Sequence, residues 1–191
     1  MAEQFIDNNY EIVKFEEFAD VYIINTCTVT NMSDRKSRQI IRRAKQINPN
    51  SILVATGCYA QTAQEELEKI TDIDLIVGNT EKKDIVKIVE DYKNNKNIER
   101  VRMSDINKQK EFVDFGNVTY TEKTRAVIKV QDGCNNFCSY CIIPYAKGRV
   151  RSRKLENVIE EIKKIADKGI KEVVITGIHV ASYGIDFDNN T

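Results

Sequence analysis

The chain has 191 residues, of which 41% are hydrophobic and 30% charged, and its 29 basic side chains balance 29 acidic ones. This is the composition of an ordinary soluble globular protein with one or two domains. No apolar run approaches the roughly 20 residues of a membrane span, and the first residues lack a signal-peptide profile, so we expect a cytoplasmic protein with no membrane partner.

The first hundred residues alternate between apolar runs and amphipathic segments. The apolar runs predict strands of a parallel sheet buried on both faces; they are Val21 to Asn25, Ile52 to Thr56, Leu75 to Val77 and Ile98 to Met103. Helical spacing predicts helices with these apolar faces: Ser37, Ile40, Ile41, Ala44 and Ile47; Ala60, Ala63, Leu67 and Ile70; Ile85, Ile88, Val89 and Tyr92. A helix end precedes them at Glu3 to Asn8. This alternation predicts an α/β fold with a doubly wound sheet.

Cys27 and Cys58 each follow a predicted strand directly. Parallel pairing would bring both cysteines to the carboxyl edge of the sheet, where the ligand crevice of such folds lies. Single buried cysteines are more often packing residues. Their matched positions nevertheless favour a shared metal site.

The second half of the chain starts after a polar stretch, which we interpret as an interdomain linker. We expect domains over residues 1–103 and 124–191, joined by a linker over residues 104–123. Ala126 to Val130 and Val173 to Ile175 predict two strands, and an amphipathic helix between them could be capped by Ser152 and closed by Gly169. A strand, loop, helix and strand in this order begin a (βα) barrel.

Three of the five cysteines lie on the loop after the first of these strands. Cys134, Cys138 and Cys141 have the spacing C-x3-C-x2-C. An odd cysteine count with such local spacing favours metal ligation over disulfides. Three sulfurs suit a 4Fe-4S cluster with one open iron better than structural zinc, which normally takes four protein ligands. A zinc knuckle or an inert buried cluster is the alternative.

Two basic segments suit an anionic partner such as RNA. One is a helix stripe and the other follows the cysteine loop; their members are Arg35, Arg38, Arg42 and Lys45, and Lys147, Arg149, Arg151, Arg153 and Lys154. The helix stripe could equally be a solvated face. We expect His179, the only histidine, to be a structural or substrate-side residue and not a metal ligand.

The cysteine spacing, with Tyr140 before the last cysteine, resembles the signature of the radical S-adenosylmethionine (SAM) enzymes. The resemblance implies that the open iron chelates SAM and that the reduced cluster cleaves SAM to a 5'-deoxyadenosyl radical. It also implies that Tyr140 packs near the adenine of SAM, and that Thr176 and Gly177 contribute to the cofactor site.

Nearly the whole chain is similar to the methylthiotransferases of this superfamily. The stretches that carry the similarity are Asn25 to Thr30, Asp34 to Gln39, Thr56 to Gln61, Val130 to Tyr145, Gly148 to Arg153 and Thr176 to His179. Thr28 to Thr30 and the basic helix resemble the type that adds a methylthio group to threonylcarbamoyladenosine in tRNA. Relatives that act on isopentenyl-adenosine or a ribosomal protein are the alternatives, together with an inactive iron-sulfur fragment.

The resemblance implies a flavodoxin-like domain with an auxiliary 4Fe-4S cluster, a radical SAM barrel and an RNA-binding domain. Cys27 and Cys58 match two of the three auxiliary ligands. The first strand with the third cysteine, most of the barrel and the last domain are expected outside this chain, which would then be inactive alone. The family implies a tRNA substrate and a reducing electron donor such as flavodoxin, and we expect a monomer.

Overall fold

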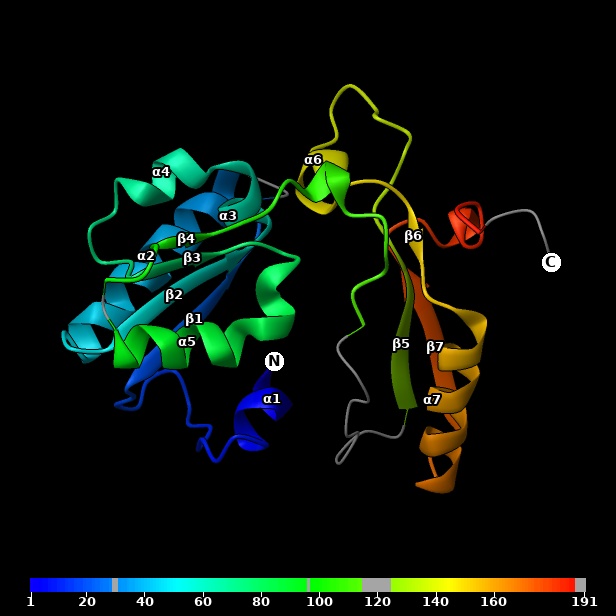
Figure 1. Ribbon diagram of the computed structural model, residues 1–191, viewed down its shortest axis with the longest axis horizontal. Helices are drawn as coiled ribbons and strands as arrows, with labels where there is room; N and C mark the ends of the chain where they lie inside the picture. The colour runs from blue at the N-terminus through cyan, green and yellow to red at the C-terminus, as the bar shows by residue number, and fades with distance from the viewer. Residues whose placement is uncertain (29–30, 96, 115–124, 188–191) are drawn as a thin grey trace. The chain divides into compact units, whose positions relative to one another are not determined.

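The computed structural model describes residues 1–28, 31–95, 97–114 and 125–187, with residues 31–34 described by their backbone alone. The chain divides into two compact units, Met1–Ile106 and Asn107–Thr191 (Figure 1). Within the described residues the first unit holds a four-stranded sheet and the second a three-stranded sheet. Residues 115–124, which include residues 115–123 of the expected linker, lie outside the described residues.

The sheet of the first unit is parallel throughout, with its strands in chain order. The strands are β1 (Val21–Thr26), β2 (Ile52–Gly57), β3 (Leu75–Val77) and β4 (Val101–Arg102). The side chains of β3 and nearly all of β2 are buried, as expected for strands covered on both faces. The predicted parallel sheet is therefore confirmed.

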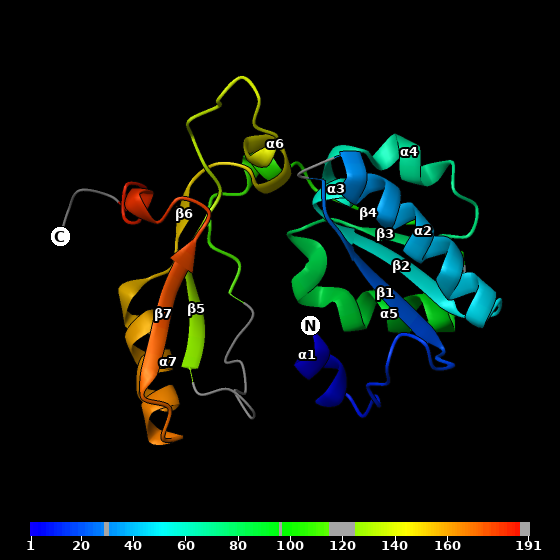
Figure 2. The same ribbon diagram turned by 180° about the vertical axis from the view of Figure 1, so that it is seen from behind.

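Helices cover both faces of this sheet, as Figures 1 and 2 show from opposite sides. They are α2 (Asn31–Ile47), α3 (Cys58–Thr62) and α4 (Gln64–Glu68) on one face, and α1 (Ala2–Ile6) and α5 (Ile85–Asn94), which follows the 3-10 turn η1 (Glu81–Asp84), on the other. Ile41, Leu53 and Tyr59 pack in the first core, and Val54 and Ile85 in the second. Apolar burial on both faces makes the sheet doubly wound, as predicted.

Two predicted elements of the first unit differ from the structure. The expected helix through Ala60 and Ile70 is broken at Ala63, whose backbone (φ −132°, ψ 43°) leaves the helical region, so two short helices form. The expected strand from Ile98 to Met103 shrinks to the two residues of β4. The neighbouring β3 has only three residues and offers little edge for pairing.

The second unit is built around a strand, helix and parallel strand. Its elements are β5 (Arg125–Asp132), α6 (Ile143–Lys147), β6 (Arg151–Ser152), α7 (Leu155–Asp167), β7 (Glu172–Gly177) and the 3-10 turn η3 (Val180–Ser182), and the turn η2 (Ile106–Lys108) lies at the unit boundary. β5 pairs with β7 in parallel and with β6 antiparallel. Val158 and Ile165 of α7 pack on Ile128 of β5. This is the expected beginning of a (βα) barrel.

The ends of α7 show one wrong and one confirmed prediction. Ser152 does not cap the helix, whose N-cap residue is Lys154, because its N–H and hydroxyl both donate to the carboxylate of Asp186 (2.8 and 2.5 Å). Gly169 closes the helix as predicted, with φ +80° and its N–H donating to the carbonyl of Ala166 (2.8 Å). No helix in the described part of the chain is long and apolar enough to span a bilayer.

Candidate metal centre

The cysteine loop begins at Gly133, directly after β5. This residue has φ +74°, and a Cβ placed on it would lie 1.8 Å from the carbonyl oxygen of Arg149. Only glycine fits this conformation and this approach. Gly133 therefore allows the start of the loop to pack closely against the backbone that follows α6.

Backbone and side-chain hydrogen bonds hold the loop against the same segment. The N–H of Cys134 donates to the carbonyl of Gly148 (3.0 Å), and the N–H of Val150 donates to the side-chain oxygen of Asn135 (3.1 Å). The N–H of Cys141 donates to the carbonyl of Cys138 (2.9 Å), which turns the chain between the last two cysteines.

Aromatic contacts add to these bonds in the middle of the loop. Phe137 has a left-handed backbone (φ +47°), which is unusual for a bulky residue. The guanidinium of Arg149 lies 4.4 Å from its ring centroid, and the ring of Tyr145 meets it edge-on at 5.6 Å. The ring of Phe137 thus contacts Arg149 of the basic segment and Tyr145 of α6.

All three thiols of the loop are free and accessible to a ligand. Cys138 is exposed, whereas Cys134 and Cys141 are partly buried. Among the described residues, however, no three His, Cys, Asp or Glu side chains lie close enough together to hold a metal ion. Three free thiols on one short loop are chemically suited to ligate an iron-sulfur cluster. In the described structure these three thiols do not converge on one point.

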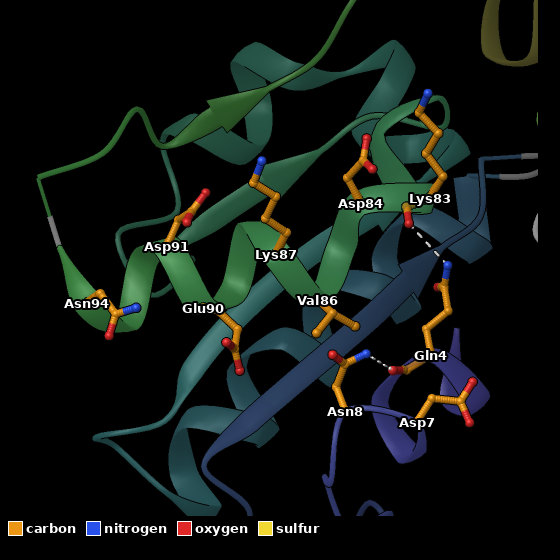
Figure 3. Close-up of a pocket in the computed structure, with 10 residues that line it drawn as sticks. All are labelled: Gln4, Asp7, Asn8, Lys83, Asp84, Val86, Lys87, Glu90, Asp91 and Asn94. Carbon is orange, nitrogen blue, oxygen red and sulfur yellow. Dashed lines mark hydrogen bonds between the residues drawn. The ribbon is translucent and has the colours of Figure 1, made fainter.

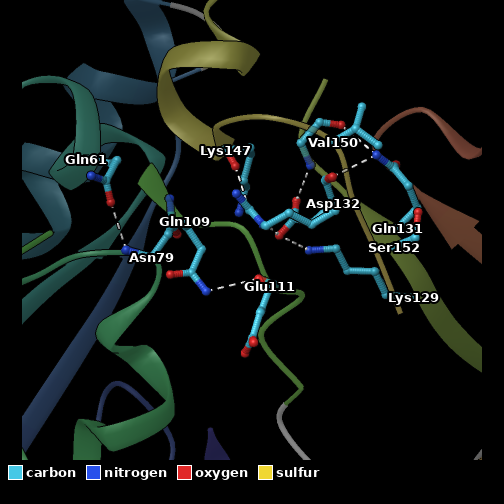
Figure 4. Close-up of polar contacts among 12 residues, drawn as sticks. Gln61, Asn79, Gln109, Glu111, Lys129, Gln131, Asp132, Lys147, Val150 and Ser152 are labelled. Carbon is cyan, nitrogen blue, oxygen red and sulfur yellow. Dashed lines mark hydrogen bonds and ion pairs between the residues drawn. The ribbon is translucent and has the colours of Figure 1, made fainter. Parts of the chain in front are cut away.

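Cations surround the carboxylate of Asp132, at the end of β5. Lys129 lies 2.6 Å from it (Figure 4), and Arg151 lies 3.7 Å from it. Burial raises the pKa of this carboxyl, but the charges of Lys129, Lys147 and Arg151 outweigh burial, so that the net shift of the pKa is downward. Asp132 also accepts the N–H of Gly133 (3.0 Å). The charge of Asp132 thereby fixes the start of the loop.

Gln131 is a residue of this site whose role the sequence analysis missed. Its side chain is fully buried and bonds to the backbone of Asp132, Gly133 and His179; Figure 4 shows Gln131 beside Asp132. A signal was present in the sequence: an amide in line with the apolar residues of a buried strand needs polar partners inside the protein. Sequence alone did not indicate where those partners lie.

The other candidate residues of this unit lie at the end of β7 and on the loop. Thr176 and Gly177 end β7, and Gly177 pairs with Gln131 of β5. Tyr140 is 90% exposed, so it is not a core residue in this structure. The Nδ1 atom of His179 lies 2.5 Å from the hydroxyl of Ser182, which agrees with a structural role.

Cys27 and Cys58 lie at one edge of the first sheet, as predicted. Thr26 pairs with Gly57 in the register of β1 and β2, and the two cysteines follow these partners directly. The hydroxyl of Thr26 donates to the carbonyl of Thr56 (2.5 Å) and accepts the N–H of Ala60 (3.2 Å). These bonds connect β1 to β2 and to the start of α3, directly beside the two cysteines. Val29 and Thr30, on which the subtype prediction depends, lie outside the described residues.

Four of the nine predicted RNA-binding cations form contacts within the fold instead, and two of these four lie after the cysteine loop. In the segment after the cysteine loop, Arg151 and Arg153 are only 2% and 6% exposed. Arg153 forms a bidentate ion pair with Asp114 (2.7 and 3.1 Å) and also contacts Glu161. The prediction was wrong for these two arginines, because their charges are neutralised inside the unit. Arg149 and Lys154 are exposed.

The basic stripe on α2 likewise contains two side chains that form contacts within the fold and two that are exposed. Arg38 donates to the hydroxyl of Tyr59 (2.6 Å), and Lys45 pairs with Asp74 (2.8 Å). Both side chains thus brace the fold. Arg35 and Arg42 are exposed and remain available to an anionic partner.

A polar hollow of about 480 Å³ between α1 and α5 is separate from the cysteines. Figure 3 shows Gln4 and Asn8 facing α5 across it, with Gln4 donating to the carbonyl of Lys83 (3.1 Å). Its lining mixes acids such as Asp7 and Glu90 with Lys83 and with neutral side chains. It contains no thiol and none of the candidate residues.

Two protein-family profiles match the chain. Residues 1–78 match the profile described as uncharacterized protein family UPF0004, and residues 128–187 match the radical SAM superfamily. The second match contains the whole cysteine loop together with β7. The two matches fall in different compact units.

Curated relatives match across both units. The threonylcarbamoyladenosine tRNA methylthiotransferase MtaB of Aquifex aeolicus is 50% identical over 97% of this chain and 45% of its own length. The Bacillus subtilis protein of that name is 45% identical over 95% of this chain and 40% of its own length. The chain is similar in both units to the radical SAM methylthiotransferases. It spans less than half the length of these relatives.

The methylthiotransferase family includes more than one substrate class. The ribosomal protein uS12 methylthiotransferase RimO of Clostridium botulinum is 34% identical over 95% of this chain and 41% of its own length. Among solved structures, the radical SAM methyltransferase TsrM of Kitasatospora setae has a TM-score of 0.56 and 18% identity, and the match covers 86% of this chain and 38% of that one. This likeness supports the fold alone. The predicted cofactors, a 4Fe-4S cluster and SAM, are those of the radical SAM superfamily.

Proposed function

We propose that this chain is the part of a tRNA methylthiotransferase that holds its cofactors, and that the whole enzyme adds a methylthio group to C2 of N6-threonylcarbamoyladenosine next to the anticodon. The observation that carries the proposal is the loop of three free thiols after β5, in a chain 50% identical to a relative of that name. The target is an unactivated C–H bond, which acid-base catalysis cannot functionalise, so a cofactor must supply the reactive species.

Cys134, Cys138 and Cys141 would hold a 4Fe-4S cluster and leave one iron for SAM. When bound, the reduced cluster supplies the electron that cleaves SAM. Tyr140, exposed beside Cys141, is free to pack on a bound adenine, and the end of β7 at Thr176 and Gly177 offers backbone groups to the same ligand. Gly133 and Gln131 together position the start of the cysteine loop.

Cys27 and Cys58 would ligate the auxiliary cluster, together with a third ligand. Their start from paired residues of β1 and β2 supports this role, because thiolates of one cluster must converge. The family resemblance implies that this cluster delivers sulfur. We retain residues 104–123 as the proposed linker between the two cluster-binding domains.

The proposed RNA partner is tRNA, held through phosphate contacts to the exposed cations Arg35 and Arg42 on α2 and Arg149 and Lys154 near the loop. The free state of all five cysteines suits the reducing cytoplasm, where we place the reaction. We propose a monomer that receives electrons from a donor such as flavodoxin.

A ribosomal-protein substrate is the second candidate, supported by the 34% identity to RimO. An isopentenyl-adenosine tRNA substrate would use the same cofactors. A non-catalytic iron-sulfur module would load a cluster and leave all three substrates unchanged.

The cofactor part of the proposal is tested by anaerobic reconstitution of the chain. We expect about one 4Fe-4S cluster on the loop, and a Cys134→Ala, Cys138→Ala, Cys141→Ala variant that loses this iron and sulfide. Cys27→Ala is the matched control, because it removes a thiol of the other unit and should leave the loop cluster in place. Unchanged iron in the triple variant would refute the ligand assignment.

The substrate part is tested with a chimera. This chain replaces the matching part of the relative that is 50% identical, and tRNA and ribosomal protein from cells carrying only the chimera are analysed by mass spectrometry. We expect methylthiolated threonylcarbamoyladenosine, abolished by Cys138→Ala. Modification of uS12 or isopentenyl-adenosine instead would leave the chemistry in place and overturn the substrate.

A further inference from the structure

The side chain of Gln131 joins the two segments that are proposed to hold SAM and its cluster. Its Nε2 donates to the carbonyls of Asp132 and Gly133 (2.7 Å each), and Gly133 directly precedes the first cysteine. Its Oε1 accepts the N–H of His179 (2.7 Å), just after the end of β7. One amide thus links the start of the cysteine loop to the segment 176–179.

The hydrogen bonds of this amide are specific in their direction. A glutamine amide has two N–H donors, and both are used; its oxygen takes the one N–H that faces it. Reversing the amide would place Oε1 against two carbonyl oxygens and the NH₂ group against an N–H, so the network determines the orientation. With the side chain 0% exposed, water cannot replace any of these partners.

The backbone around Gln131 is built to accommodate it. The register of β5 and β7 shifts between Lys129, which pairs with Thr176, and Gln131, which pairs with Gly177. A Cβ on Gly177 would lie 2.9 Å from Oε1 and 3.0 Å from the Cβ of Gln131. Gly177 therefore leaves the space that the amide fills, and the extra residue in β5 brings that amide between the two segments.

We infer that Gln131 is a positioning residue, which couples the cysteine loop to the end of β7 so that both present one geometry to SAM. The inference rests on the proposed function, since it assigns the site of SAM to these two segments. A misplacement of about 1 Å costs on the order of a hundredfold in a reaction that depends on alignment. A purely apolar residue at this position would fill the core but leave two carbonyls and an N–H unpaired.

The test compares Gln131→Met, which keeps the length of the side chain and removes all three bonds, with Tyr183→Phe. The control also removes one side-chain bond to the backbone, from the Tyr183 hydroxyl to the carbonyl of Arg153 (2.9 Å), away from the loop. In the full chain we measure amide hydrogen exchange at His179, iron content after reconstitution, the Kd for SAM, and the change in the electron paramagnetic resonance spectrum of the reduced cluster when SAM is added.

We expect Gln131→Met to exchange the His179 amide at least about tenfold faster and to bind SAM about tenfold or more weakly. It should load nearly wild-type iron, because the thiols remain, and show a diminished spectral response to SAM. Tyr183→Phe should match the wild type in all four measurements. If Gln131→Met loses its fold by circular dichroism, Gln131→Glu decides, since its carboxylate still accepts from His179 but cannot donate to the two carbonyls.

The results separate this inference from the function on which it rests. Wild-type affinity for SAM in a folded Gln131 variant would overturn the positioning role while leaving the cluster assignment in place. A wild-type chain that loads no iron on its loop would contradict the proposed function and the inference with it. Equal loss of SAM binding in Tyr183→Phe would show general destabilisation and also overturn the inference.

Discussion

Gly133 and Arg149 lie so close together that a Cβ on the glycine would come within 1.8 Å of the arginine carbonyl oxygen. The contact closes the base of the cysteine loop, because Gly133 precedes Cys134 and the neighbouring carbonyl of Gly148 accepts the N–H of Cys134. The chain on both sides of the loop thus forms one rigid base beneath the first thiol.

The contact predicts the effect of Gly133→Ala. The methyl group adds a backbone clash to the left-handed strain of about 1 to 2 kcal/mol, so we expect a larger loss of unfolding free energy and reduced iron loading. Gly169→Ala is the matched control, since Gly169 also has positive φ but nothing lies within 4 Å of its Cβ position. Equal losses in the two variants, measured by chemical denaturation, would contradict the close contact.

Arg153 and Arg149 should separate stability from RNA binding. Arg153→Ala leaves Glu161, which is only 4% exposed, and Asp114 without their cation, and we expect a loss of about 3 to 5 kcal/mol of unfolding free energy. Arg149→Ala should change stability by less than about 1 kcal/mol, while the salt slope of binding to a tRNA anticodon stem-loop falls by about 1. The reverse pattern would show that the buried arginine is the RNA contact.

Tyr59 should make the first unit sensitive to alkali. Burial raises the pKa of this phenol, and its hydrogen bond to Glu66 (2.7 Å) acts in the same direction, although Arg38 opposes them. A raised folded pKa contributes stability that is present below the unfolded value of about 10 and is lost as pH rises through the folded value. Denaturation at a series of alkaline pH values should show this loss in the wild type and a smaller one in Tyr59→Phe. A loss of the same size in that variant would exclude Tyr59 as its source.

The shared sheet edge predicts that Cys27 and Cys58 can be crosslinked. Paired strands lie about 4.8 Å apart, and the two cysteines follow the partners Thr26 and Gly57. A short thiol-to-thiol reagent should therefore join them, as detected by peptide mass spectrometry, and the product should disappear in Cys58→Ser. Failure to crosslink in the folded wild-type chain would argue against a joint site.

The amino-acid sequence by itself determined the class of the fold and placed the three thiols on which the proposed chemistry of the loop rests. Strand burial on both faces leaves continuous apolar runs, such as Ile52 to Thr56, and helices leave a period that ends before Pro49. The thiols at Cys134, Cys138 and Cys141 are also local in sequence, so their spacing alone indicated a cluster. The common location of Cys27 and Cys58 could also be predicted from the sequence, because each cysteine follows a strand and parallel strands end at the same edge of a sheet.

Only the tertiary structure decided which polar side chains serve the fold. Arg153 and Arg149 are two basic residues of one segment, but one is buried against Asp114, 39 positions away, and the other is exposed beside the ring of Phe137. The partner of Gln131 at His179 is 48 positions away. Sequence periodicity reports on neighbours within one helix or strand, whereas pairing between distant charges and amides depends on how those elements pack, and burial then makes each pairing obligatory.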